Sequence, residues 1–183
     1  GGAEITTTAD IPSRGTGLGS SSTFTVGLLN VLNAYRGRHV SSEELARCSC
    51  EIEIELCGQP IGKQDQYAAA FGGLNLIEFH PDESVSVTPL IMNRDLRTLL
   101  EERIIIFYTG IAPSASAILA NQSNETGADG RKQATLKRMV ELAHVLRDEL
   151  SQGNIDSFGH ILDENWALKK SLTAGITSTP IDD

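Results

Sequence analysis

The chain has 183 residues, a length that suits one ordinary domain or a large part of a two-domain enzyme. Apolar residues make up 40% and charged residues 21%, which is typical of a globular chain and argues against disorder and against a membrane protein. The formal net charge of −9 repels polyanions, so we expect small-molecule partners rather than nucleic acid.

The first half of the chain predicts mainly helices. Residues 3–9 look like a strand, and apolar residues then recur at helical spacing from Phe24 to Tyr35, ahead of a glycine cap at Gly37. Ser41 and Glu44 form a capping-box pair, and an apolar stripe that continues to Leu56 favours a second helix.

The second half predicts strands followed by helices. Residues 74–79 and 85–90 read as two strands joined by a turn, and residues 104–108 read as a buried strand. A long amphipathic helix follows from Leu136 to Leu150, and residues 155–162 and 166–172 suggest two more. No basic segment followed by an apolar run opens the chain, and the longest apolar run is too short to span a membrane, so we expect a cytoplasmic protein. Its three cysteines lie too close together for a disulfide framework, which indicates free thiols.

A loop rich in glycine and serine, GTGLGSSST from Gly15 to Thr23, separates the first predicted strand from the first helix. Glycines allow a ligand to approach the backbone, and the amides at a helix start bind negative charge, so the loop can hold phosphate. The plainer interpretation is a flexible turn with Ser20 or Ser22 as a helix cap, and composition alone does not decide between the two. The loop does not keep the spacing of the dinucleotide motif, and Gly58 to Lys63 has too few residues between its glycines for a P-loop.

A second informative stretch runs from Glu51 to Gly73. Phosphoryl transfer to an alcohol uses a carboxylate that accepts the hydroxyl proton, and Asp65 near the cation of Lys63 could do this. The alternative is an exposed Lys and Asp at the start of a short helix, residues 64–71, and the residues alone favour that alternative.

Both stretches resemble the GHMP kinases, a superfamily that includes galactokinase and mevalonate kinase. The similarity lies in PSRGTGLGSSS, residues 12–22, and in GQPIGKQDQYAAAFGG, residues 58–73. It implies an α+β fold with a ribosomal protein S5 domain 2-like N-terminal part over residues 1–98, and the start of a helical, ferredoxin-like C-terminal part over residues 99–183. The family's first and third motifs are expected before Gly1 and after Asp183, so we expect a fragment.

The resemblance also implies ATP and Mg²⁺ as cofactors and gives each site residue a role. Asp65 becomes the catalytic base, assisted by Lys63, while Glu51 and Glu55 become surface charges. Ser21 and Glu53 become the magnesium ligands. The phosphate-binding residues are Gly15, Gly17, Gly19, Ser20, Ser21 and Ser22, and the substrate-binding residues are Gln66, Thr109 and Gly110.

The sugar that accepts the phosphoryl group is the least determined feature. GKQDQYAA, the following GG and the later YTG resemble the bacterial heptose kinases, which implies the anomeric hydroxyl of D-glycero-D-manno-heptose 7-phosphate, and Lys63 would suit this anionic sugar. Another GHMP sugar kinase, acting on galactose, fucose or a uronic acid, is the nearest alternative. A nucleotide-binding module without catalysis and a structural fragment without a ligand are two further alternatives. We also expect a homodimer.

Overall fold

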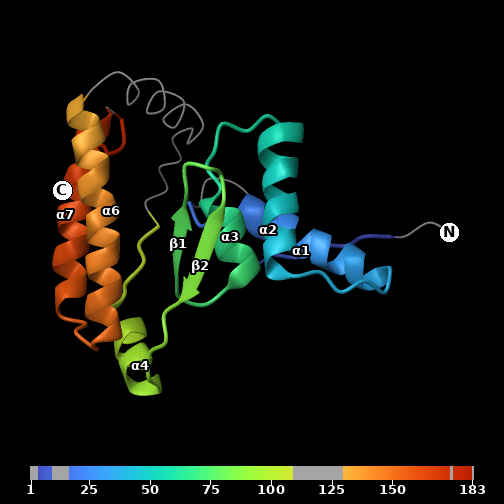
Figure 1. Ribbon diagram of the computed structural model, residues 1–183, viewed down its shortest axis with the longest axis horizontal. Helices are drawn as coiled ribbons and strands as arrows, with labels where there is room; N and C mark the ends of the chain where they lie inside the picture. Colours follow the sequence, from blue (N-terminus) through green and yellow to red (C-terminus); the bar gives the residue numbers. More distant parts are fainter. Residues whose placement is uncertain (1–3, 10–16, 109–129, 174, 183) are drawn as a thin grey trace. The chain divides into compact units, whose positions relative to one another are not determined.

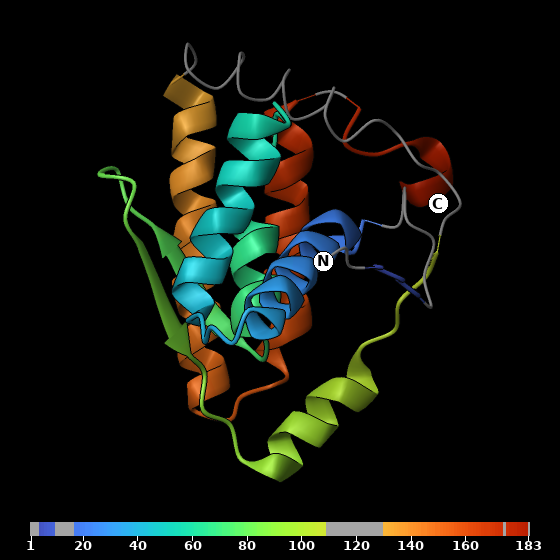
Figure 2. The same ribbon diagram turned by 90° about the vertical axis from the view of Figure 1, so that its right-hand side faces the viewer.

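The computed structural model describes residues 4–9, 17–108, 130–173 and 175–182, and Figures 1 and 2 show it from two sides. These residues form helices and one two-stranded antiparallel sheet, so the predicted α+β class is confirmed. They divide into two compact units, one up to Phe71 and the other from Gly72 onward. This division differs from the predicted domain border after residue 98, and that border stays a prediction.

The first unit contains helices α1, α2 and α3 and a π-helical segment, η1. Ser41 caps α2 as predicted, because its side chain accepts a hydrogen bond from the amide of Glu44 at 3.1 Å. The π-helical segment continues α2 directly, and the amide of Cys57 bonds to the carbonyl of Ile52, five residues back, at 2.9 Å. The bounds are α1 Ser20–Tyr35, α2 Ser42–Cys50, η1 Glu51–Leu56 and α3 Gln64–Phe71.

The core of the first unit forms where α1 packs on α2 and α3. Val26, Val40 and Leu45 are buried there, and Leu29 of α1 packs against them. The apolar stripe that predicted α1 does not face this core. Phe24, Val31 and Tyr35 are 52%, 64% and 76% exposed, because the helix turns its Val26 side toward α2 and α3. The pattern thus predicted the helix correctly and its buried face wrongly.

The second unit combines a β-hairpin with helices. The hairpin strands pair antiparallel as predicted, with Ile77 opposite Val87. The core of the second unit is built around Leu100, Leu150 and Ile155. Helices α6 and α7 lie side by side (Figure 1), and Arg138 joins them through an ion pair with Glu164 at 2.8 Å. The bounds are β1 Asn75–Phe79, β2 Val85–Pro89, α4 Arg94–Arg103, α6 Gly130–Ser151, α7 Ser157–Leu172 and α8 Thr179–Asp182.

Several elements differ from the prediction. Residues 4–9 and 104–108 contain no strand, since no strand in the described residues lies beside them to supply hydrogen bonds. The apolar side chains from Ile104 to Tyr108 are 47–81% exposed. The two helices expected after residue 155 are one helix, α7, because the intervening Asp163–Asn165 breaks no helical hydrogen bonds. Helix α4 was not predicted. Over the chain as far as the structure describes it, every helix is too short or too polar to cross a membrane.

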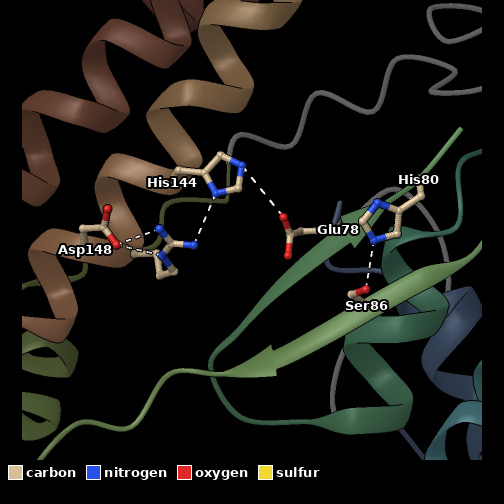
Figure 3. A network of polar contacts seen from close by, with 6 residues as sticks. Glu78, His80, Ser86, His144 and Asp148 are labelled. Carbon is tan, nitrogen blue, oxygen red and sulfur yellow. Dashed lines mark hydrogen bonds and ion pairs between the residues drawn. The ribbon is translucent and has the colours of Figure 1, made fainter.

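Polar contacts connect the hairpin with α6 in the second unit (Figure 3). Nε2 of His144 lies 3.9 Å from Oε1 of Glu78, and Nδ1 of the same ring lies 3.5 Å from Nη1 of Arg147. Within the hairpin, His80 and Ser86 form a hydrogen bond of 2.9 Å across the strands. Glu78 and His144 are each more than one third exposed, so water screens their attraction and the contact adds little stability.

Candidate functional site

The predicted phosphate loop ends at the start of α1, and glycine is required there. Gly17 and Gly19 have φ angles of +68° and +63°, a left-handed conformation that side chains disfavour. Gly19 is the N-cap of α1, and no side chain caps the helix. The amides of a first helical turn have no partner within the helix, so this terminus presents donors and the positive end of the helix dipole to an anion. The geometry is what phosphate binding needs.

Glu53 lies beside this helix start, although it is 31 and 32 residues away from the serines in sequence. It projects from η1, is only 4% exposed, and its carboxylate accepts hydrogen bonds from two consecutive serines of α1. Ser21 donates to Oε1, and Ser22 donates to Oε2 at 2.6 Å. A buried carboxylate is usually paired with a cation or a metal. The three residues therefore form a candidate metal site at the start of α1.

Gln66 supplies a third hydrogen bond to the same carboxylate. It lies in the first turn of α3 with no exposed surface, and its Nε2 donates to Oε2 of Glu53 at 2.6 Å. Its own Oε1 is buried without a hydrogen-bond partner. In the structure the side chains of Gln66 and Ser22 both donate to Glu53, while their expected contacts with substrate and phosphate stay predictions. Neither placement could be read from the sequence, because the spacing along the chain does not reveal which helix faces are buried.

Asp65 also lies close to this helix start. It precedes Gln66 in α3 and is exposed, and a Cβ atom added at Gly19 would come within 3.2 Å of its Cγ and 3.4 Å of its Oδ2. The side chain of the predicted base therefore occupies the space that a side chain at the loop glycine would take. Because Glu53 reaches the helix start through Ser21 and Ser22, the two carboxylates predicted to act together both lie at the first turn of α1.

Lys63 is half-buried just ahead of α3. Burial disfavours the thiolate of Cys50 and raises the pKa of this thiol to about 11, although the positive charge of Lys63 acts to lower it. Cys50 is one of three free thiols, as predicted. The role of Lys63 in catalysis stays a prediction. Gly15, Thr109 and Gly110 lie outside the described residues.

The residues at the helix start fit a magnesium ion. Mg²⁺ prefers hard oxygen ligands and keeps several waters, so it needs only one or two protein carboxylates together with the phosphates of a nucleotide. The Glu53 carboxylate and the Ser21 hydroxyl supply two such oxygens in direct contact. No group of three or more His, Cys, Asp or Glu residues able to hold a metal occurs in the described ranges.

Comparisons with known proteins identify the kind of domain that carries these residues. Residues 1–73 match the family model of the GHMP kinases N terminal domain, and this segment contains every described site residue. Residues 1–73 thus carry a GHMP kinase N-terminal domain.

Several relatives are sugar kinases. The chain is 30% identical over 176 residues to the D-glycero-alpha-D-manno-heptose 7-phosphate kinase of Campylobacter jejuni, a match that covers 96% of this chain and 51% of that protein. It is 29% identical to the galactokinase of Pyrococcus furiosus, covering 93% of this chain and 54% of that one. A crystal structure of a D-glycero-D-manno-heptose 1-phosphate kinase from Bacteroides thetaiotaomicron superposes with a TM-score of 0.69 at 32% identity, covering 91% of this chain and 47% of the other. The chain thus spans about half the length of these relatives.

Proposed function

We propose that the protein is an ATP- and Mg²⁺-dependent kinase that phosphorylates a hydroxyl of a sugar or sugar phosphate, with C1 of a heptose 7-phosphate as the first candidate. The observation that carries the proposal is the meeting of two carboxylates at one helix start. Glu53 is hydrogen-bonded to Ser21 and Ser22 of α1, and the side chain of Asp65 lies where a Cβ atom at Gly19, the N-cap of the same helix, would project.

The two carboxylates suit different tasks because their surroundings differ. Asp65 is exposed, so it can reach the hydroxyl of an incoming sugar, accept its proton and leave the oxygen to attack the γ-phosphorus as the bond to ADP breaks. Glu53 is buried against hydroxyl and amide donors, so it would hold magnesium together with Ser21. Bound magnesium would neutralise negative charge on the phosphates. The amides of the first turn of α1 and the backbone of Gly17 and Gly19 would bind the β and γ phosphates.

The acceptor is proposed from the relatives. Both the Campylobacter jejuni protein and the Bacteroides thetaiotaomicron structure are named as heptose phosphate kinases. Half-buried Lys63 precedes the helix that carries Asp65 by one residue, and its cation would suit the phosphate of such a sugar. Galactose is the second candidate, because the galactokinase match has nearly the same identity over nearly the same share of the chain. A cytoplasmic location and a homodimer stay predictions.

A product assay tests the proposal. The full-length protein is incubated with ATP and Mg²⁺ and a panel that contains heptose 7-phosphate, galactose, fucose and a uronic acid, and ³¹P NMR locates the new phosphate. We expect a sugar 1-phosphate from the heptose. A product from galactose alone would replace the acceptor and keep the mechanism. If ATP raises the melting temperature and no product forms, the protein is a nucleotide-binding module, and the kinase proposal is wrong.

A further inference from the structure

The two oxygens of the Glu53 carboxylate are held in different ways. Oε2 accepts two hydrogen bonds of 2.6 Å each, one from Ser22 of α1 and one from Gln66 of α3. Both donors are buried, with 2% and 0% of their surface exposed. Oε1 accepts its hydrogen bond from Ser21, whose residue is exposed. Oε2 is therefore held by two buried donors, whereas Oε1 is bonded to a serine that reaches the surface.

The orientation of the Gln66 amide follows from its neighbour. A carboxylate only accepts hydrogen bonds, so the NH₂ group must face Oε2, and the amide oxygen must point the other way. That oxygen is buried and has no hydrogen-bond partner. An unpartnered buried acceptor is unfavourable, and a hydrogen bond to a charged acceptor is stronger than one to a neutral acceptor. Within the described residues, the contact with Glu53 is thus the polar interaction that accounts for an amide at this position.

We propose that Ser22 and Gln66 are positioning residues: their hydrogen bonds hold Oε2 of Glu53 in place and thereby orient Oε1, which is bonded to the Ser21 hydroxyl, toward the metal. The inference rests on the proposed function of Glu53 as a magnesium ligand. It gives both side chains a role different from direct contact with phosphate or sugar, since the Ser22 hydroxyl and the Gln66 NH₂ group already donate to Glu53. Groups that orient a metal ligand in this way typically change metal affinity or activity by about 10- to 100-fold when removed.

The test compares four variants of the full-length protein. Ser22→Ala and Gln66→Met each remove one donor to Oε2, and Glu53→Gln removes the charge. Ser49→Ala is the matched control, because Ser49 is also fully buried but its hydroxyl has no hydrogen-bond partner. The measurements are the Mg²⁺ concentration for half-maximal rate, the KM for the sugar, and Mn²⁺ binding in the presence of ATP, followed by electron paramagnetic resonance. Melting curves check that each variant is folded, and Gln66→Asn, which withdraws the amide by one methylene, replaces Gln66→Met if that variant does not fold.

We expect Ser22→Ala and Gln66→Met to raise the half-maximal Mg²⁺ concentration and the Mn²⁺ dissociation constant by roughly 10-fold, with little change in the KM for the sugar. Ser49→Ala should leave all three unchanged. If Gln66 acts only through Glu53, adding Gln66→Met to Glu53→Gln should have no further effect on metal binding.

The possible failures can be told apart. If Glu53→Gln leaves the metal dependence unchanged, the proposed metal site is wrong and the inference is overturned with it. If Glu53→Gln weakens metal binding but Ser22→Ala and Gln66→Met do not, the metal site stands and the positioning role is refuted. A rise in the KM for the sugar in Gln66→Met, at unchanged metal affinity, would instead assign Gln66 to the substrate.

Discussion

A methyl group added at Gly19 should disturb catalysis more than folding, and a second glycine makes this measurable. Gly19 and Gly37 flank α1 with nearly the same left-handed φ angles, +63° and +70°. An alanine at either position bears the same backbone penalty of about 1–2 kcal/mol. For a chain of this size, that penalty should lower the melting temperature by about 2–8 °C in both variants.

The two sites differ in what the new methyl group meets. At Gly37, among the described residues other than its chain neighbours, no atom lies within 4 Å of the added carbon, whereas at Gly19 the methyl carbon would lie 3.2 Å from Cγ of Asp65 and 3.3 Å from its Cβ. These contacts are tighter than normal, so the Asp65 side chain must move by a few tenths of an ångström. A misplacement of about 1 Å can cost ~100-fold in rate, so we expect Gly19→Ala to lower turnover on the order of 3- to 10-fold.

The assay measures turnover at saturating ATP, magnesium and sugar, together with thermal unfolding, for both variants. Gly37→Ala should lose stability and keep its turnover. Gly19→Ala should lose both. Equal turnover in the two variants, at comparable losses of stability, would refute the view that a methyl group at position 19 displaces the predicted base.

Three further predictions concern single side chains. Asp65→Asn should lower turnover by ~100- to 10,000-fold with little change in the ATP dissociation constant, and calorimetry with steady-state kinetics checks both; turnover like that of the wild type would exclude a general base. Tyr67→Phe removes a hydrogen bond of 2.9 Å to Glu43 and should lower the free energy of unfolding in urea by about 1 kcal/mol. Burial, followed by this hydrogen bond, raises the pKa of Tyr67 from 10.0 to about 12. The contribution of Tyr67 to the free energy of unfolding is therefore present below pH 10 and is lost as the pH rises toward 12, and the phenylalanine variant should lose less stability between these pH values. At pH 8 a thiol reagent should label exposed Cys57 and spare Cys50, which is buried with a pKa of about 11, and rapid labelling of folded Cys50 would contradict its burial.

The sequence predicted the elements that carry strong local signals. The capping serine of α2, the β-hairpin and the long helix α6 all appear where expected, because caps, turns and helical spacing act within a few residues. Helix α4 also had a local signal, since Asn93 accepts a hydrogen bond from the amide of Leu96 at 2.8 Å, and the Asn cap could have revealed it. The strand predicted for residues 104–108 failed because a strand depends on a partner that the segment itself cannot specify.

The site was predictable in its residue types and not in its internal contacts. Glycines, serines and two carboxylates indicated phosphate chemistry, and the resemblance to a family selected Asp65 and Glu53 among many acidic residues. That Ser22 and Gln66 both turn inward to Glu53 depends on how α1, η1 and α3 pack, and packing partners are separated by 13 to 31 residues along the chain. The same dependence explains why α1 buries Val26 instead of the more apolar stripe of Phe24, Val31 and Tyr35.

Glu53 lies in the π-helical segment η1, so insertions and deletions before Glu53 should have a different effect from those after it. Each residue of an α-helix turns the chain by about 100°, so loss of one residue between Ser42 and Ile52 could restore regular helix while swinging Glu53 away from Ser21 and Ser22. Loss of one residue between Ile54 and Leu56 would leave Glu53 in register and rotate only the residues after the deletion. Viable length changes in descendants of this sequence should therefore accumulate after position 53 and be absent from the helix before it.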